Sequence, residues 1–234
     1  MPRVIKHPDL RRSEILDQAF ELFLSRGYDN TSLNDIIAEG GISKGAFYHY
    51  FRSKEELLAA LADRFARITL AELEDVLNDS ELNPLERLNA FLAKGMQVKT
   101  ELAPGAWAVF SALFRPENQG LYQRVITASE SFFRPVLTKI ITQGVKENIF
   151  HTPDPEGVAD ILQQLASNTR AFVTRIFGAV TEKDREEALK AFQRRLQLNG
   201  IAVDRLLRLP DGTLYVPKLR EVRKLFTKLV ENKS

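Results

Sequence analysis

The sequence predicts an all-α protein, and three observations lead to this prediction. Apolar residues recur at helical spacings of three and four along almost the whole chain, and runs with the alternating pattern of strands are missing. Proline or glycine stands at most junctions between these periodic segments. Apolar residues make up 44% of the chain, enough for a core, and the 27% that are charged argue against disorder.

The length of 234 residues exceeds the usual size of one domain, so we expect a small module followed by a larger one. We place the boundary between residues 56 and 57, which gives domains 1–56 and 57–234. No internal repeat or low-complexity segment is visible.

The small module is expected to hold three helices, two of them very short. The first covers about 10 to 25 and is followed by a glycine in "RGY". A helix of two turns comes next, capped by Thr31 or Ser32, and Ser32 has Asp35 at the spacing of a capping box. The glycine pair in "EGGIS" interrupts the chain, and Ser43 caps the third helix.

The larger domain is expected to be an ordinary set of helices, separated by proline or glycine. The predicted ranges are about 54 to 77, 84 to 102, 105 to 114, 119 to 148 with some break, 155 to 177, 183 to 208, and 218 to 230. The segment "LPDGTLYVP" before the last helix is a turn.

The third helix has two different faces when it is projected at 100° per residue. One face is aromatic and is expected to pack on the first two helices: Phe47, Tyr50 and Phe51. The other is left for solvent or a partner: Lys44, Gly45, Tyr48 and His49. A two-turn helix is not stable alone, so tertiary packing must hold it, as in the reader helix of a helix-turn-helix module.

The exposed face has the chemistry of a DNA reader. Lys44 can donate to guanine O6 and N7, and Gly45 leaves room for a close approach to base edges. Tyr48 and His49 can donate to phosphates or contact thymine methyl groups. The competing interpretation, an aromatic cluster that is only core, fits Phe47 and Phe51. It leaves Tyr48 and His49 outside, because they cannot share that core without rotating the phenylalanines out.

The charges near this helix support the same interpretation. The formal charge of the whole chain is only +2, yet the charged residues from 40 to 54 are Lys44, Arg52 and Lys54. Ser53 caps the following helix, and the first amides of that helix together with Lys54 are expected to form a site for one phosphate. Lys6, Arg11 and Arg12 are candidates for extending the basic surface.

These features resemble a known family. The stretch "RRSEILDQAFELFLSRGYDNTSLNDIIAEGGISKGAFYHYFRSKEELL", about 11 to 58, is similar to the N-terminal domain of the TetR family of bacterial transcription regulators. The glycine pair in "EGG", where alanine usually precedes the glycine, departs from the family pattern only in the turn. The resemblance implies a homodimer that binds a palindromic operator in double-stranded DNA. It also implies repression of transcription until a small effector binds the C-terminal domain.

The resemblance also implies roles for single residues. The expected phosphate contacts are Thr31, Tyr48, Tyr50 and Lys54, and the expected base-reading residues are Lys44, Gly45 and His49; Ser43, which caps the helix, is counted with them. For Tyr50 the projection disagrees, because it places the ring toward the core.

Two further sites are expected in the larger domain. An apolar or aromatic effector is expected among the central helices, and the candidates are Phe91, Met96, Trp107, Phe110, Phe114, Tyr122 and Phe133. The helices at 155 to 177 and 183 to 208 have apolar faces wider than one buried stripe, which predicts a four-helix dimer interface with candidates Leu162, Leu165, Phe172, Phe192 and Leu196. Plain packing within a monomeric bundle is the alternative for both sets.

Other classes of protein fit the sequence less well. An enzyme would be the main rival, but cysteine, a glycine-rich phosphate loop and a His-Glu metal spacing are all missing, so we expect no cofactor and no metal. A helical interaction module without DNA binding is the second rival. No run of about 20 apolar residues and no signal-peptide pattern is present, which indicates a cytoplasmic protein with no membrane partner. The basic final helix could lie on a membrane surface, but packing of its apolar seam on the larger domain is the preferred interpretation.

Overall fold

The computed structural model describes residues 8–114 and 119–230, although the side chains at 99, 102–112, 121, 124, 128, 129 and 227–230 are not described. Throughout these ranges the chain forms helices and no strand, which confirms the predicted fold class. None of the described helices is both long and apolar enough to cross a membrane.

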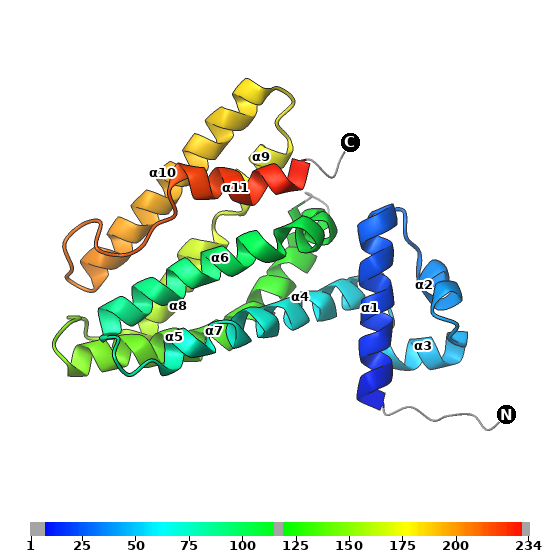
Figure 1. Cartoon of the computed structure of the whole chain (residues 1–234), viewed down its shortest axis with the longest axis horizontal. Helices are drawn as coiled ribbons and strands as arrows, with labels where there is room; N and C mark the ends of the chain where they lie inside the picture. The colour runs from blue at the N-terminus through cyan, green and yellow to red at the C-terminus, as the bar shows by residue number, and fades with distance from the viewer. Residues whose placement is uncertain (1–7, 115–118, 231–234) are drawn as a thin grey trace.

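The small module stands at one end of the molecule (Figure 1). It consists of α1 (Pro8–Arg26), α2 (Leu33–Glu39) and α3 (Lys44–Tyr50), close to the predicted ranges. The next helix, α4 (Lys54–Ala71), passes from this module into the larger body, and α1 lies across its beginning.

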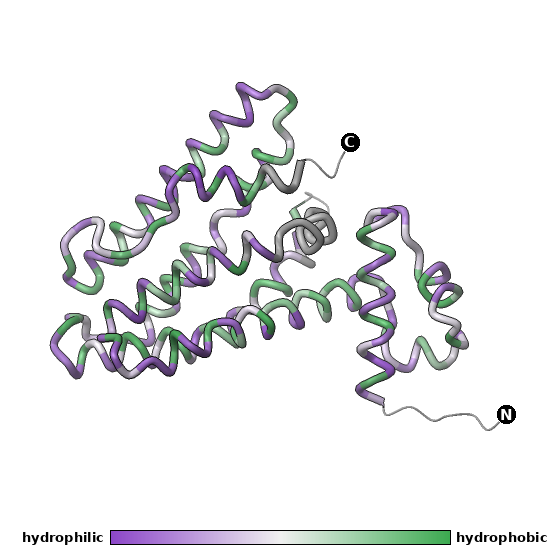
Figure 2. The backbone as a smooth tube through the Cα atoms, viewed as in Figure 1, coloured by the Kyte–Doolittle hydropathy of each residue, from purple (hydrophilic) through white to green (hydrophobic). Residues whose placement is uncertain are grey.

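The larger body contains the remaining helices. They are α5 (Glu74–Asn78), α6 (Pro84–Phe110), the short 3₁₀ helix η1 (Ser111–Phe114), α7 (Gln119–Lys146), α8 (Pro155–Ser167), α9 (Arg170–Phe177), α10 (Glu182–Leu206) and α11 (Leu219–Val230). Hydrophobic and hydrophilic stretches alternate along most of these helices, as expected where one face of a helix is covered (Figure 2).

The structure corrects three predicted boundaries. The helix expected to reach about 77 ends at Ala71, and α5 follows it. Two helices were expected at 84 to 102 and 105 to 114, but the chain forms the single helix α6 followed by η1. Pro104 and Gly105, which suggested the break, lower helix propensity but do not end the helix here.

The helix expected at 155 to 177 is divided at Asn168 and Thr169. Hydroxyl groups account for the break: Ser167 donates to the carbonyl of Gln164 at 3.0 Å, and Thr169 donates to that of Ala166 at 2.7 Å. Such side-chain bonds compete with the helical backbone pattern.

Among the described side chains, three hydrophobic clusters form the interior. The first joins the small module to the larger body, because Leu113, Tyr122 and Val125 pack with buried residues of α1 to α4. The second lies among α5 to α8 and α10. The third lies under α9, α10 and α11, where Val222, Leu225 and Phe226 are buried. The predicted packing of the final helix on the larger domain is thus confirmed.

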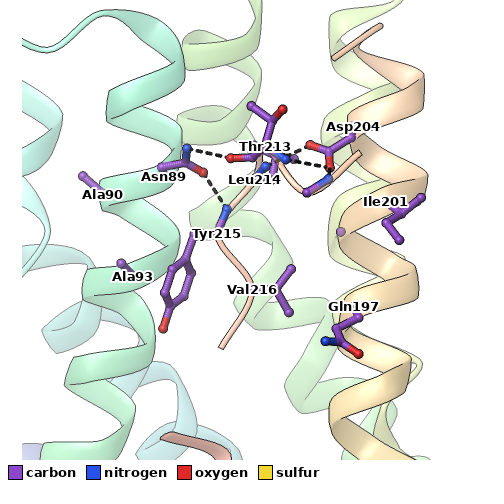
Figure 3. Close-up of a pocket in the computed structure, with 12 residues that line it drawn as sticks. Asn89, Ala90, Ala93, Gln197, Ile201, Asp204, Thr213, Leu214, Tyr215 and Val216 are labelled. Carbon is purple, nitrogen blue, oxygen red and sulfur yellow. Dashed lines mark hydrogen bonds between the residues drawn. The ribbon is translucent and has the colours of Figure 1, made fainter. Parts of the chain in front are cut away.

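A buried carboxylate fixes the turn that leads into α11. Asp204 is fully buried and accepts from the backbone N–H groups of Gly212 at 2.7 Å, Thr213 at 3.2 Å and Leu214 at 2.9 Å (Figure 3). From α6, the amide of Asn89 donates to the carbonyl of Thr213 and accepts from the N–H of Tyr215. The turn is therefore held from both α10 and α6.

We expect Asp204→Ala to lower the free energy of unfolding by about 3 kcal/mol or more, because three backbone donors lose a charged acceptor in a region with little water. Denaturant unfolding measures this loss. Asp211→Asn is the matched control: Asp211 is exposed and pairs with Arg205, and surface pairs contribute about 1 kcal/mol or less. Equal losses in the two variants would contradict the role of Asp204.

Candidate nucleic-acid interface

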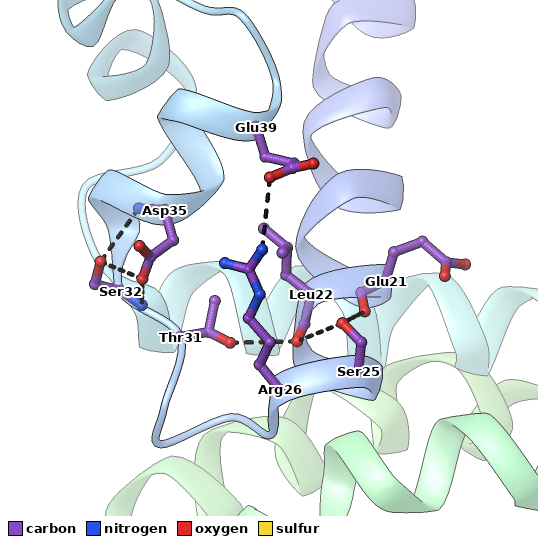
Figure 4. Close-up of polar contacts among 8 residues, drawn as sticks. All are labelled: Glu21, Leu22, Ser25, Arg26, Thr31, Ser32, Asp35 and Glu39. Carbon is purple, nitrogen blue, oxygen red and sulfur yellow. Dashed lines mark hydrogen bonds and ion pairs between the residues drawn. The ribbon is translucent and has the colours of Figure 1, made fainter.

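The turn after α1 sets the position of α2. Gly27 has φ +83°, a left-handed conformation that glycine adopts without strain. The Thr31 side chain is buried, and its hydroxyl donates to the carbonyls of Gly27 at 2.8 Å and Leu22 at 3.3 Å (Figure 4 shows the second bond). Thr31, expected at a phosphate, therefore directs its hydroxyl into the protein.

The predicted capping box starts α2. The Ser32 hydroxyl accepts from the Asp35 N–H at 3.2 Å, and the Asp35 carboxylate accepts from the Ser32 N–H at 2.7 Å (Figure 4). These bonds to Ser32 hold the pKa of Asp35 below its usual range. On the same side of the module, Arg26 at the end of α1 pairs with Glu39 at the end of α2, with 3.6 Å between the charged groups.

Burial of aromatic rings holds α3 in place. Ser43 caps it by accepting from the N–H of Ala46 at 3.3 Å. Phe47 is completely buried and Phe51, at the C-terminal cap, is 1% exposed. The two rings pack on each other with 6.4 Å between their centroids. The predicted inward direction of both phenylalanines is confirmed.

The opposite face of α3 is open. Lys44, Gly45, Tyr48 and His49 are all exposed, as the projection predicted. A Cβ atom added at Gly45 would have no heavy atom within 4 Å, so the surface there is free. Tyr50 lies between the two faces: it is half-buried and packs against the first cluster, with its ring edge-on to His49 at 5.2 Å.

The start of α4, where an anion site is expected, makes several polar contacts within the protein. The Lys54 ammonium donates to the carbonyls of Tyr28 at 2.8 Å and Thr31 at 3.1 Å. Ser53 accepts from the N–H of Glu56, so that amide is already capped. Lys54 and the amide of Glu56 thus have partners within the protein, and the phosphate contact expected there stays a prediction.

Two exposed cations that the sequence analysis named, beyond those assigned to base or phosphate contacts, extend the basic surface. Arg52, just after α3, is exposed, and Arg12 is exposed with its guanidinium 5.1 Å from the centre of the Phe51 ring. In the sequence, the excess of positive charge between residues 40 and 54 pointed to Arg52 as part of this surface. Arg11 pairs with Glu14 at 2.8 Å, and Lys6 lies outside the described residues.

The predicted effector residues are divided between the clusters. Phe91 packs on Phe133 at 6.3 Å between ring centroids, and Phe114 packs on Tyr122 at 5.5 Å. Met96 contacts the third cluster. The side chains of Trp107 and Phe110 are outside the described part of the chain.

A pocket of about 910 Å³ lies elsewhere, between α6, α10 and the segment 212–216 (Figure 3). None of the five effector candidates with described side chains lines it. The polar side chains of Asn89 and Asp204 at this pocket are used in holding the turn. Its other lining includes Ala90, Ala93 and Ile201.

The predicted dimer residues are mostly turned inward. Phe192 is 7% exposed and belongs to the third cluster, where Phe172 and Leu196 pack against it. Leu162 and Leu165 are half-buried against the second cluster. The large apolar residues that stay exposed on α8 and α10 are Ile161 at 37%, Leu198 at 57% and Leu206 at 38%; Ile161 and Leu206 belong to the apolar faces that predicted the interface, and Leu198 was not expected.

Comparisons with known proteins agree with this architecture. Residues 15–61 match the family model described as bacterial regulatory proteins, tetR family. The HTH-type transcriptional repressor KstR2 of Mycobacterium tuberculosis (strain ATCC 25618 / H37Rv) is 31% identical over 159 residues, which are 66% of this chain and 76% of that protein. The uncharacterized HTH-type transcriptional regulator YfiR of Bacillus subtilis (strain 168) is 26% identical over 66% of this chain and 75% of its own.

Solved structures share the fold at low identity. A putative TetR-family transcriptional regulator from Syntrophomonas wolfei superposes with a TM-score of 0.57 at 22% identity, over 82% of this chain and 96% of that one. RolR, solved with resorcinol, gives a TM-score of 0.56 at 16% identity, over 90% and 97% of the two chains.

Truncation of a side chain is expected to destabilise the protein strongly on the buried face of α3 and much less on the exposed face. Phe47→Ala should lower the free energy of unfolding by about 3–5 kcal/mol, because it leaves a cavity in the first cluster. Tyr48→Ala, at an exposed neighbour, should lower it by only about 1 kcal/mol, mostly through the lost edge-on contact of its ring with Phe47 at 5.7 Å between centroids. Denaturant unfolding of both variants tests the assignment, and a larger loss for Tyr48→Ala would reverse it.

Proposed function

The chain belongs to the TetR family of bacterial transcription regulators, and from this premise we propose a ligand-responsive repressor that binds a palindromic operator as a homodimer. The relatives are DNA-binding transcription regulators, not enzymes. The proposal assigns base reading to α3, dimerisation to α8 and α10, and effector binding to the central helices.

The observation that carries the proposal is the exposed face of α3. Lys44 and Gly45 lie in its first turn, where a recognition helix contacts base edges in the major groove. Lys44 supplies a donor for guanine, and the missing side chain at Gly45 permits a close approach. Tyr48 follows one turn later and can reach a phosphate beside the groove, and His49 next to it can contact base edges. Arg52 and Arg12 add positive charge to the same module.

Dimerisation is proposed through the apolar residues exposed on α8 and α10. Leu198 is more than half exposed, and Leu206 lies two turns later on α10. Asn199 of α10 donates to the Leu165 carbonyl of α8 at 3.0 Å, so the two helices present one surface. A two-fold axis through this surface would pair it with the same surface of a second chain. It would also make the operator palindromic, with reader helices about 34–36 Å apart.

The effector is proposed to be small and apolar or aromatic, bound among the aromatic side chains of α6, η1 and α7. Phe114 is half-buried in this region, and its neighbour Tyr122 belongs to the cluster that also contains α1 and α4. A ligand that displaced these rings would move side chains that pack against α1 and α4 of the DNA-binding module. Repression would then depend on ligand through that shared cluster.

Selection of bound duplexes from random DNA tests the proposal. We expect an inverted repeat whose half-sites lie one or more helical turns apart. Affinity for it should fall steeply as salt rises. The selection is then repeated with short fatty acids and simple phenols as trial effectors. Failure to enrich any sequence at low salt would reject the function.

Gly45→Ala should raise the stability of the fold and at the same time weaken operator binding. Alanine raises helix stability by about 1 kcal/mol over glycine, and the structure leaves space for the methyl group. The same methyl group would stand between α3 and the base edges, so we expect weaker binding to the selected operator. Thermal unfolding and operator titration measure the two effects. Unchanged affinity would remove Gly45 from the reading face.

Leu198→Glu should produce monomers, because it places a charge in the proposed apolar interface. Val180→Glu is the control, since Val180 is 91% exposed in the loop between α9 and α10. Sedimentation of both variants measures their mass. A Leu198→Glu variant that remained dimeric would place the interface on another surface.

A further inference from the structure

The pocket between α6, α10 and the segment 212–216 has fixed walls (Figure 3). Asp204 of α10 holds the segment through the three backbone N–H groups described above, and Asn89 of α6 holds it through two further hydrogen bonds. Val216 packs closely on α10, since a Cβ atom added at Gly200 would lie 2.5 Å from its Cγ2. The pocket, of about 910 Å³, is therefore present before any ligand binds and has the size of a small-molecule site.

The lining of this pocket is mostly small and apolar. Ala90 and Ala93 come from one face of α6, three residues apart, and Ile201 comes from α10 on the other side. The segment adds Val216 and the half-buried ring of Tyr215. Walls of alkyl groups with one aromatic ring favour a flat apolar molecule, because packing between rings adds to the burial of apolar area.

The hydroxyl groups at the pocket already have partners. Thr213 donates to the carbonyl of Pro210 at 2.6 Å, and Tyr215 donates to the carboxylate of Glu221 at 3.1 Å. Burial, and then the nearby Glu221, raise the pKa of Tyr215 to about 12, so its phenol stays neutral. A ligand therefore meets an aromatic ring here and no phenolate.

The charge at the pocket disfavours an ionic ligand. Asp204 is the one charged residue in the described lining, and it is fully buried with both oxygens accepting N–H groups. An anion would be repelled by this carboxylate, whereas a cation would exchange its water for alkyl walls and an acceptor already in use. Gln197 differs from the other polar residues of the lining, because its side chain is exposed and makes no hydrogen bond to the described residues.

We propose that this pocket is a second ligand site, separate from the effector region assigned to α6, η1 and α7. It takes an uncharged, largely apolar aromatic molecule whose one polar group meets the Gln197 amide. A molecule bound here contacts α6, α10 and the segment before α11 together. The inference goes beyond the proposed repressor function and does not depend on DNA binding.

A single thiol tests the site, because the chain contains no cysteine. Gln197→Cys places this thiol at the pocket. The variant is equilibrated with benzyl, carboxyethyl and aminoethyl disulfides at equal concentrations in the presence of a small thiol, and intact-mass spectrometry measures the three adducts. Relative to an exposed thiol, we expect the benzyl adduct to gain about tenfold over each charged adduct. This ratio corresponds to about 1.4 kcal/mol, slightly less than full burial of a phenylalanine side chain contributes.

Gln123→Cys is the matched control, with the same substitution at an exposed glutamine of α7 outside the lining. Its adducts give the intrinsic preferences of the reagents for an exposed thiol. Ala93→Trp, combined with Gln197→Cys, fills the pocket, and its adduct ratios should fall to those of the control. Circular dichroism establishes that each variant is folded, and Ala90→Phe takes the place of Ala93→Trp if that variant is not.

Three results would reject the proposal. Equal adduct ratios in Gln197→Cys and Gln123→Cys would mean that the pocket does not bind the ring. A preference of Gln197→Cys for either charged reagent would overturn the assigned ligand class. A benzyl preference that persisted in the filled variant would place the ring outside the pocket.

Discussion

The burial of Phe47 is the constraint on which the DNA-binding module depends. A helix of seven residues is unstable in isolation, so α3 exists because its rings are covered by neighbouring helices. Phe47 has no exposed surface, and Phe51 beside it has almost none. Once these two rings point inward, helical geometry leaves Lys44 and Gly45 on the outside. The exposed face, to which we assign base reading, is therefore a consequence of the packing face.

Hydrophobic packing and hydrogen bonds at η1 connect this module to the larger body. Leu113 and Tyr122 belong to the hydrophobic cluster of the small module. From α9, Arg170 donates to the Leu113 carbonyl at 3.5 Å, and Thr174 donates to that of Phe114 at 3.0 Å. The short helix η1 is thus held from α9 on one side and contacts the cluster of α1 and α4 on the other. A rearrangement in the larger body has a physical route to α1 through these contacts.

Local patterns predicted some features well and others poorly. The capping box at Ser32 and Asp35 was predictable because both partners lie three residues apart. The Lys54 contacts were not, since they join residues 23 and 26 positions apart. The phosphate contact expected at Lys54 rested on its place at the start of a capped helix and on the family resemblance, and neither shows which groups of the protein its ammonium contacts. Periodicity likewise did not show that Phe192 is buried within its own chain, because an apolar residue has the same pattern whether its own chain or a second chain covers it.

The sequence by itself determined which segments are helical and which rings of α3 face inward, because caps and helical periodicity act between residues only a few positions apart. It also determined the family, through the pattern in residues 15–61. Only the tertiary structure decided where Thr31 and Lys54 direct their polar groups and which apolar residues of α8 and α10 stay exposed. These outcomes depend on contacts between distant segments, and neither composition nor spacing along the chain specifies them.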